Sequence, residues 1–214
     1  MRLANHLATA VLYVHSGHFV HKRIRPENII IFGTSHDEDK KFPFAIGYPF
    51  LVGFDRSRFE HAPTLGKGDI VLEDCIYQHP DRWGVDTEHK FSMLHDVYSL
   101  GVVLLEIGIW KSFVRSRNGG ERYVAWSLLQ DLIDNGELKE GKTPNDIKDR
   151  FIEMAQKLLP PKMGRKYTNV VISCLSDDVH KGAGISDNEL EEKVGMGYIR
   201  NVVSRLENLQ IIYK

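Results

Sequence analysis

The chain has 214 residues, 42% of them hydrophobic and 27% charged, which is typical of a globular protein with one sizeable core. Its net charge of −1 gives no support for a nucleic-acid-binding protein or for binding to an anionic membrane surface. The most apolar run, 100–109, is too short to span a bilayer and is interrupted by two glycines and a glutamate. The isolated cysteines Cys75 and Cys174, and the lack of a signal-peptide core at the start, lead us to expect an intracellular, cytoplasmic protein.

The first part of the chain predicts one helix and two short strands. Apolar residues recur at helical spacing over 3–14, which predicts an amphipathic helix that ends near Gly17. The β-branched run 29–32 predicts a strand, and 48–54 predicts a second strand that enters a turn. The polar stretch 34–41 between them is expected to be an exposed loop.

The rest of the chain is expected to be mainly helical. No periodicity persists over 55–84, which we interpret as an extended surface segment. The run 96–109 is apolar on nearly every side and predicts a helix buried in the core. We expect the three tryptophans, Trp83, Trp110 and Trp126, to pack in this core. Further helices are expected at 122–135, at 144–159 with Thr143 as N-cap and Pro144 behind it, at 165–176 and at 187–209.

The segment Val20-His21-Lys22-Arg23-Ile24-Arg25-Pro26-Glu27-Asn28 resembles the catalytic loop of protein kinases, whose pattern is His-Arg-Asp-x-x-x-x-Asn. His21 and Asn28 are seven positions apart, as that pattern requires. The resemblance places Arg23 where kinases have the aspartate that accepts the substrate hydroxyl proton. A guanidinium stays protonated and has no acceptor, so Arg23 cannot act as this base.

Further motifs extend the resemblance to the C-terminal lobe of a eukaryotic protein kinase over nearly the whole chain. Residues 51–55 stand where a strand leads into Asp-Phe-Gly, and 77–81 resembles the Tyr-x-Ala-Pro-Glu that closes the activation segment. Residues 96–106 look like the central buried helix of that lobe, and Cys174-Leu175 like the end of a late helix. We therefore expect 1–214 to be a single kinase C-lobe, a helical bundle around a buried helix with short strands near the catalytic loop, and without the N-terminal lobe.

The departures from the kinase pattern bear on activity. Gly53 replaces the Mg²⁺-binding aspartate of Asp-Phe-Gly, while Phe54 is kept, and Asp81 after Pro80 replaces a glutamate. The glycine-rich phosphate loop is missing from this sequence. We therefore expect no cofactor, with ATP and Mg²⁺ disfavoured, although Asn28 and Asp55 remain weak candidates for holding them.

The resemblance also implies roles for single residues. His21 would steady the catalytic loop, and Asp96 would accept backbone N–H groups of that loop. Asn28 would either fix the loop through its amide or bind Mg²⁺, the first being preferred. Arg23 would either bind a phosphorylated partner or mark a lost activity, again with the second preferred, and Arg25 keeps the charge of a phosphate-contacting position.

A metal site is not expected. His15, His18 and His21 are spaced three apart, but a turn at Gly17 breaks the helical geometry that zinc binding on one face would need.

A narrower similarity concerns a fungal kinase-like domain found with HeLo-type prion-inhibition modules. It depends on three segments, 18–21, 49–55 and 163–167. That similarity implies a regulatory part in signalling.

The preferred hypothesis is a pseudokinase that binds partner proteins through its helical surface, with possible self-association through the exposed cleft face. The alternative is an atypical active kinase that transfers ATP phosphate to a protein Ser or Thr, with Asp55 as metal ligand and Glu27 as base, if a longer parent supplies an N-lobe. A third hypothesis is a truncated gene product without an independent role.

Overall fold

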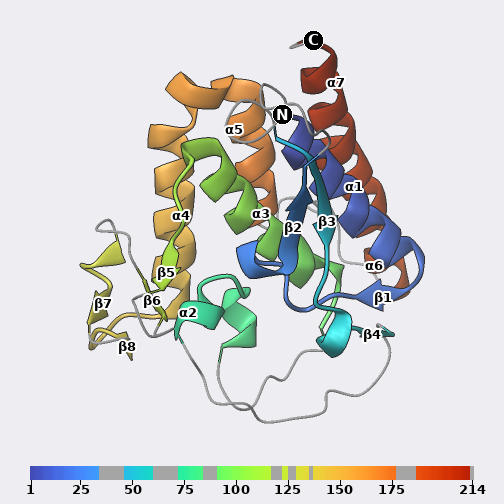
Figure 1. Ribbon diagram of the computed structural model, residues 1–214. Coiled ribbons are helices and arrows are strands. Elements are labelled where there is room, and N and C mark those ends of the chain that lie inside the picture. Colours follow the sequence, from blue (N-terminus) through green and yellow to red (C-terminus); the bar gives the residue numbers. More distant parts are fainter. Residues whose placement is uncertain are drawn as a thin grey trace.

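The structure, a computed structural model, is mainly helical, as expected (Figure 1). It describes residues 1–33, 46–59, 72–83, 91–116, 122–124, 129–134, 137–176 and 187–212. The longer helices are α1 (Arg2–Ser16), α3 (Met93–Ile109), α4 (Pro144–Leu158), α5 (Pro160–Leu175), α6 (Asp187–Tyr198) and α7 (Ser204–Ile212). The shorter ones are α2 (Leu72–Cys75), the 3-10 turns η1 (Pro26–Asn28), η3 (Phe54–Arg56) and η4 (Pro80–Arg82), and the π-helical turn η7 (Ile199–Val203).

The described strands form short antiparallel pairs at the edges of the helical body. The pairs are β1 (Phe19–Val20) with β4 (Arg58–Phe59), β2 (Ile29–Phe32) with β3 (Tyr48–Leu51), β5 (Val114–Ser116) with β6 (Arg122–Val124), and β7 (Ile133–Asp134) with β8 (Glu137–Leu138). In the second pair Ile29 lies opposite Leu51. β2 starts directly after Asn28, and β3 ends just before Gly53. This pairing therefore brings the segment that resembles the kinase catalytic loop beside the turn that follows β3.

Helix α3 is the centre of the core, as its sequence predicts. Nearly all of its side chains are buried, and it packs against α1, α4 and α5 (Figure 1). A Cβ on Gly101 would lie only 2.8 Å from the Cβ of Cys174, so the glycine allows α3 and α5 to approach closely. The buried Tyr167 hydroxyl donates a hydrogen bond of 2.7 Å to the carbonyl oxygen of Leu104, which links the same two helices.

The helix boundaries at α4 and α5 follow local sequence signals. Asp146 Oδ2 accepts the Thr143 backbone N–H at 2.7 Å and its hydroxyl at 2.8 Å, and Pro144 occupies the first helical position. Gly164 breaks the helical dihedral angles inside α5 with φ at 77°, so the regular part begins at 165 as predicted. The last expected helix, 187–209, is present as α6, η7 and α7 in succession.

The helix expected over 122–135 is wrong. The structure has β6 and β7 there, with the β-branched Val124 opposite the buried Val114 of β5. The sequence between β7 and β8 is Asn135-Gly136, a strong hairpin signal that the helical interpretation overlooked. Cross-strand packing therefore outweighs the helical spacing of the apolar residues.

The extended surface segment expected over 55–84 is also wrong in part. Helix α2 and turn η4 lie there, and Ile76 and Tyr77 are buried. Of the tryptophans, Trp83 packs half-buried against the core, whereas Trp110 ends α3 and is 60% exposed. Trp126 and the loop expected at 34–41 lie outside the described residues.

None of the helices in the described part of the chain combines the length and the apolar character needed to cross a membrane.

Candidate functional site

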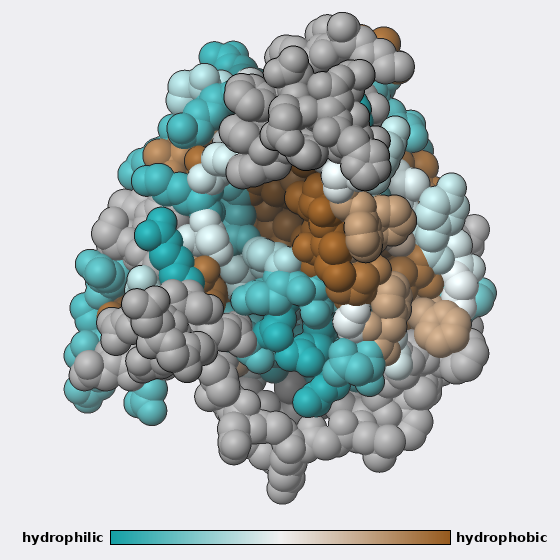
Figure 2. Space-filling view, in the orientation of Figure 1, coloured by the Kyte–Doolittle hydropathy of each residue, from teal (hydrophilic) through white to brown (hydrophobic). Residues whose placement is uncertain are grey.

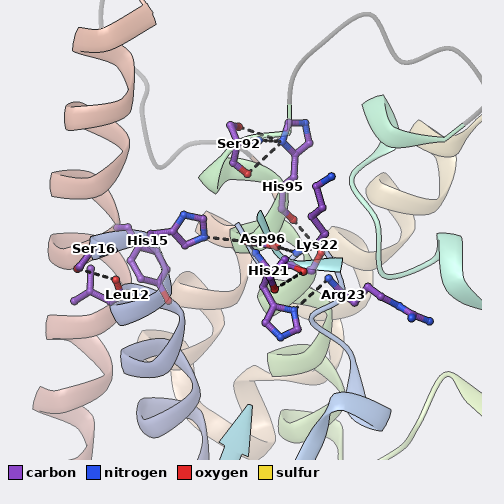
Figure 3. A network of polar contacts seen from close by, with 12 residues as sticks. Leu12, His15, Ser16, His21, Lys22, Arg23, Ser92, His95 and Asp96 are labelled. Atoms are coloured by element: carbon purple, nitrogen blue, oxygen red, sulfur yellow. Dashed lines mark hydrogen bonds and ion pairs between the residues drawn. The ribbon is translucent and has the colours of Figure 1, made fainter. Parts of the chain in front are cut away.

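The centre of the candidate site is the buried carboxylate of Asp96, near the start of α3. Its Oδ2 accepts the His21 backbone N–H at 2.7 Å and its Oδ1 accepts the Lys22 backbone N–H at 2.9 Å (Figure 3). His15 Nε2 on α1 lies 3.0 Å from the same Oδ2. Lys22 has a positive φ of 72°, a conformation that these bonds hold in place. Asp96 thus joins α1, the loop after β1 and α3 at one point.

His21 is buried beneath the loop and connects it to the chain after β3. Its Nε2 bonds the Val52 carbonyl oxygen at 3.0 Å, and its Nδ1 accepts the Arg23 backbone N–H at 3.3 Å. The Phe54 ring meets the imidazole edge-on, with ring centroids 4.6 Å apart. Burial lowers the pKa of His21, which favours the neutral imidazole. This arrangement orients the loop and keeps the His21 side chain buried.

Asn28 and Gly53 stand at the two positions where the kinase pattern has metal ligands. Asn28 Nδ2 donates to the Arg23 carbonyl oxygen at 2.7 Å. Gly53 has a φ of 81°, and a Cβ built on it would lie 2.5 Å from both Cγ and Oδ1 of Asn28. The Asn28 amide therefore occupies the space into which a side chain at position 53 would project.

Arg23, at the position of the catalytic base, contacts carboxylates. Its Nη1 lies 3.4 Å from Asp55 Oδ2, and its Nη2 lies 4.0 Å from Asp74 Oδ2. The Asp55 side chain is 60% exposed and also lies 3.9 Å from Arg56 Nε. Asp55 is thus engaged by arginines, and no described contact joins it to Asn28.

Arg25 is more deeply set than Arg23. Its side chain is 12% exposed, its Nη1 bonds Asp74 Oδ1, and its Nε lies 3.7 Å from Glu27 Oε2. The alternative base Glu27 therefore points to Arg25. The two arginines of the loop alternate with carboxylates, so their positive charge is largely balanced within the site.

The segment that resembles the end of the activation segment is anchored by a buried glutamate. Glu106 Oε1 accepts the Tyr77 hydroxyl at 2.9 Å, the Phe113 backbone N–H at 2.5 Å and the Ser112 hydroxyl at 3.4 Å. Burial raises the pKa of Glu106 to about 7, although its three donors act in the opposite direction. Tyr77 is thereby tied to the end of α3.

Pro80 and Asp81 form the turn η4 directly after this anchor. Pro80 is buried, whereas the Asp81 side chain is 53% exposed. The contact of Asp81 is local, because His79 Nδ1 accepts its backbone N–H at 3.2 Å and lies 3.4 Å from its Oδ2. The basic residues that follow Cys174-Leu175 in the sequence, His180 and Lys181, lie outside the described residues.

Sequence reasoning missed the part of His15 in the Asp96 network and the grouping of His79, Asp81 and His95. His15 and Asp96 are 81 positions apart, and no spacing rule joins them. Of the three histidines spaced three apart in the sequence, His15 and His21 both contact Asp96, whereas His18 is exposed. The only available sequence signal for the second group was that His79 lies within the motif at 77–81 and His95 directly precedes the motif at 96–106.

An apolar face lies beside this loop. Figure 2 shows hydrophobic residues gathered around the β2–β3 hairpin, next to a hydrophilic area. A pocket of about 320 Å³ lies between α1, β2 and the end of α3. Its apolar lining includes Leu3, Leu7, Ile29, Ile31, Val103 and Trp110. Phe32 and Phe50 of the hairpin are more than half exposed and contact each other edge-on.

No family model matches the chain. It is 27% identical over 165 residues to an LRR receptor-like serine/threonine-protein kinase of Arabidopsis thaliana, which covers 74% of this chain and 17% of that protein. It is 31% identical over 140 residues to a serine/threonine-protein kinase-like protein of the same plant, covering 65% of this chain and 36% of that protein. The chain is protein kinase-like.

A third relative agrees with this kinase-like assignment. The serine/threonine-protein kinase ZRK1 of Arabidopsis thaliana is 26% identical over 152 residues, or 70% of this chain. The similarity is distant but extends over most of the kinase-like chain. The chain spans between 17% and 39% of the length of these relatives, so it corresponds to a part of each.

Proposed function

We propose that this chain is the C-terminal lobe of a pseudokinase, which binds partner proteins and does not transfer phosphate. The observation that carries the proposal is the packing of Gly53 against Asn28. A Cβ at position 53 would meet the Asn28 amide at 2.5 Å, so the loop is built around the absence of a side chain there. An active kinase needs an aspartate at that position to hold Mg²⁺ at the transferring phosphate.

The contacts of Arg23 support the same proposal independently. Arg23 lies at the base position and pairs with Asp55, the one carboxylate of the Gly53-Phe54-Asp55 turn. A general base alone contributes about 10²- to 10⁴-fold to a rate. When the metal ligand is missing as well, the charge that develops on the phosphate has no counterion at its centre. The two losses together predict phosphotransfer below detection.

An anionic ligand at Arg23 and Arg25 is a less favourable interpretation of the basic loop. Arg25 is bonded to Asp74 and lies near Glu27, and Arg23 lies near Asp55. A phosphorylated partner would have to displace these carboxylates. We therefore prefer loss of activity over acquired phosphate recognition.

Partner binding is proposed for the apolar face around β2 and β3. Exposed hydrophobic residues there include Phe32, Tyr48 and Phe50, and Ile29 and Ile31 of β2 line the 320 Å³ pocket. Apolar patches of this kind on folded proteins mark interaction sites. In a longer parent protein an N-terminal lobe would cover the face, and without one a second copy or another protein would do so.

An intracellular location is proposed as well. Both cysteines, Cys75 and Cys174, are free and buried, with their thiol pKa values raised by burial to about 11 and about 12. Unreactive free thiols are typical of proteins kept in a reducing compartment.

The second candidate function is an atypical active kinase that uses Asp55 as metal ligand. One observation favours it, because Asp55 is exposed and lies 3.4 Å from the residue at the base position, so a carboxylate is present at the edge of the loop. In this case Arg23 would have to release Asp55 when Mg²⁺ binds.

The deciding experiment is transfer of labelled γ-phosphate from ATP, with Mg²⁺ or Mn²⁺, by the native full-length protein. We expect no transfer above a protein-free blank, with an active kinase as positive control. Phosphotransfer that is abolished by Asp55→Asn and unaffected by the same change at the exposed Asp149 would overturn the proposal. A thermal shift with ATP but without transfer would leave the pseudokinase assignment standing and add nucleotide binding.

A further inference from the structure

Two histidines and one aspartate converge at the junction of turn η4 and helix α3. One ring nitrogen of His79, one ring nitrogen of His95 and one carboxylate oxygen of Asp81 all lie within 4.8 Å of one another. His79 Nδ1 is 3.4 Å from Asp81 Oδ2, and the two imidazole rings meet edge-on with centroids 5.4 Å apart. The described part of the chain has no second group of this kind.

We propose that His79, Asp81 and His95 bind one divalent transition-metal ion of the zinc class. Two imidazole nitrogens and one carboxylate oxygen are a common donor set for Zn²⁺, with a fourth position left for water or another ligand. The proposal is independent of the proposed pseudokinase function, because none of the three residues belongs to the catalytic loop.

Burial makes two of the three ligands well defined. His79 and His95 are each 7% exposed, and their rings are held by neighbours on several sides. Tyr98 packs edge-on against His79, and Phe91 packs against His95. Such packing holds the imidazoles in place before a metal arrives, which reduces the entropy lost on binding.

Ser92 contacts the His95 ring at the nitrogen that faces away from the proposed metal, and metal binding would reverse the direction of this contact. His95 Nδ1 faces Ser92, whose backbone N–H donates to it at 2.8 Å. Metal at Nε2 requires the proton on Nδ1, and Ser92 offers two acceptors, its hydroxyl at 3.1 Å and its carbonyl oxygen at 3.3 Å. This step moves one proton from Nε2 to Nδ1 within a neutral ring, and it gives up the hydrogen bond that the Ser92 backbone N–H donates to Nδ1.

The third ligand can complete the geometry by moving. Tetrahedral Zn²⁺ with bonds near 2.0–2.1 Å brings its ligand atoms to roughly 3.3 Å from one another. Two ligand atoms 4.8 Å apart, the upper limit for this group, would therefore have to approach each other by about 1.5 Å. The Asp81 side chain is 53% exposed and free to rotate inwards.

The surrounding charges make Asp81 necessary. The cationic groups of Lys22 and Arg82 lie 5.5 and 5.6 Å from the centre of the Phe91 ring, which packs against His95. These cations oppose a bound metal ion. The Asp81 carboxylate is the counter-charge within the cluster, so its removal should weaken binding most clearly.

A bound ion would join η4 to the start of α3, next to the residue that holds the loop. His95 directly precedes Asp96, which accepts the N–H groups of His21 and Lys22. The metal would thus fasten the segment that follows α2 onto the central helix.

The test is Zn²⁺ binding to the full chain, followed by calorimetry, with Co²⁺ absorption as a second readout. We expect one equivalent of metal and a rise in melting temperature on metal addition. Asp81→Asn keeps the size of an exposed side chain and should weaken binding at least about tenfold. His79→Asn keeps a capping acceptor for the turn and should weaken it likewise.

Matched controls come from the same chain. His18→Asn removes an exposed histidine at a φ of 59°, which asparagine tolerates, and Asp149→Asn removes an exposed carboxylate of α4 that is not part of the cluster. Both should bind Zn²⁺ like the parent. The proposal would be overturned if the protein did not bind one equivalent of Zn²⁺ at concentrations on the order of 100 μM. It would also be overturned if a folded Asp81→Asn variant bound Zn²⁺ as tightly as the parent. If His79→Asn failed to fold, the exposed Asp81 variant would decide alone.

Discussion

Asn28 and Gly53 are packed so tightly that a Cβ on Gly53 would lie 2.5 Å from the Asn28 side-chain oxygen. In the kinase pattern these two positions hold Mg²⁺ together. Here Asn28 turns its amide nitrogen to the Arg23 carbonyl oxygen, and the space between the two positions is closed. Restoring the missing aspartate would therefore be a structural problem before it is a chemical one.

Gly53→Ala is expected to cost more stability than the same change at Gly141. Both glycines have a left-handed backbone, with φ of 81° and 73°. Backbone strain should therefore lower the free energy of unfolding of either alanine variant by about 1–2 kcal/mol. Only Gly53 has Asn28 in the way, whereas a Cβ on Gly141 meets nothing within 4 Å. Overpacking should add about 1–3 kcal/mol at Gly53, measured as the free energy of unfolding in urea. Equal losses at both glycines would contradict the closed space.

Asp96→Asn is expected to lower the free energy of unfolding by about 3 kcal/mol or more. The buried carboxylate accepts two backbone N–H groups and faces His15, and an amide cannot replace the charge or all the accepting positions. Asp149→Asn, at an exposed position of α4, serves as control and should change stability by less than about 0.5 kcal/mol. Urea unfolding of both variants checks this, and a loss below about 1 kcal/mol at Asp96 would count against its central place.

The two arginines of the loop should differ in their contribution to stability. Arg23→Ala removes an exposed pair with Asp55 and should change the free energy of unfolding by less than about 1 kcal/mol. Arg25→Ala removes a side chain that is 12% exposed and bonded to Asp74, which should cost about 1–3 kcal/mol. Thermal and urea unfolding of the two variants side by side tests the ranking. A larger loss for Arg23 would reverse this view of the loop.

Glu106 should make stability depend on pH between about 4.5 and 7. Burial raises the pKa of the folded-state carboxyl to about 7 from 4.5, so the folded state binds the proton more tightly than the unfolded state. The stabilisation is fully present below pH 4.5 and is lost as the pH rises through 7. At 1.36 kcal/mol per pH unit the loss is at most about 3 kcal/mol.

The comparison of Glu106→Gln with the parent isolates this effect. The amide cannot ionise, so the variant should gain in stability relative to the parent as the pH is raised from 5 to 8. His21 and His95 act in the opposite direction, because their lowered pKa values cost stability as the pH falls below 6.5. Their contribution is common to both proteins and cancels. A difference between the two that is constant with pH would show that Glu106 is already ionised when folded.

The apolar face around β2 and β3 should promote self-association of the isolated chain. Phe32 and Phe50 are 57% and 52% exposed and contact each other edge-on. Phe50→Lys should shift sedimentation towards the monomer, because it places a charge in the centre of the face. Ile211→Lys, at a position on α7 that is 69% exposed, is the control and should leave association unchanged. A parent protein that is monomeric at all concentrations would contradict this prediction.

Much of the fold could be predicted from local sequence signals. The all-round apolar run predicted the buried helix α3, and Thr143 with Pro144 predicted the start of α4. The β-branched run after Asn28 predicted β2. These signals succeed because they arise within one or two turns of a helix or along a single strand. They failed over 122–135, where the pairing of β5 with β6 outweighs helical spacing.

By itself the sequence determined the residue types at the catalytic loop. In any fold Arg23 cannot be a base, because its guanidinium stays protonated, and Gly53 has no side chain to offer a metal. Tertiary structure alone decided that Asn28 closes the space at Gly53, that His15 reaches Asp96 across 81 positions, and that His79 meets His95. These relationships come from packing between segments distant along the chain, and no spacing within one segment encodes the distance between two of them.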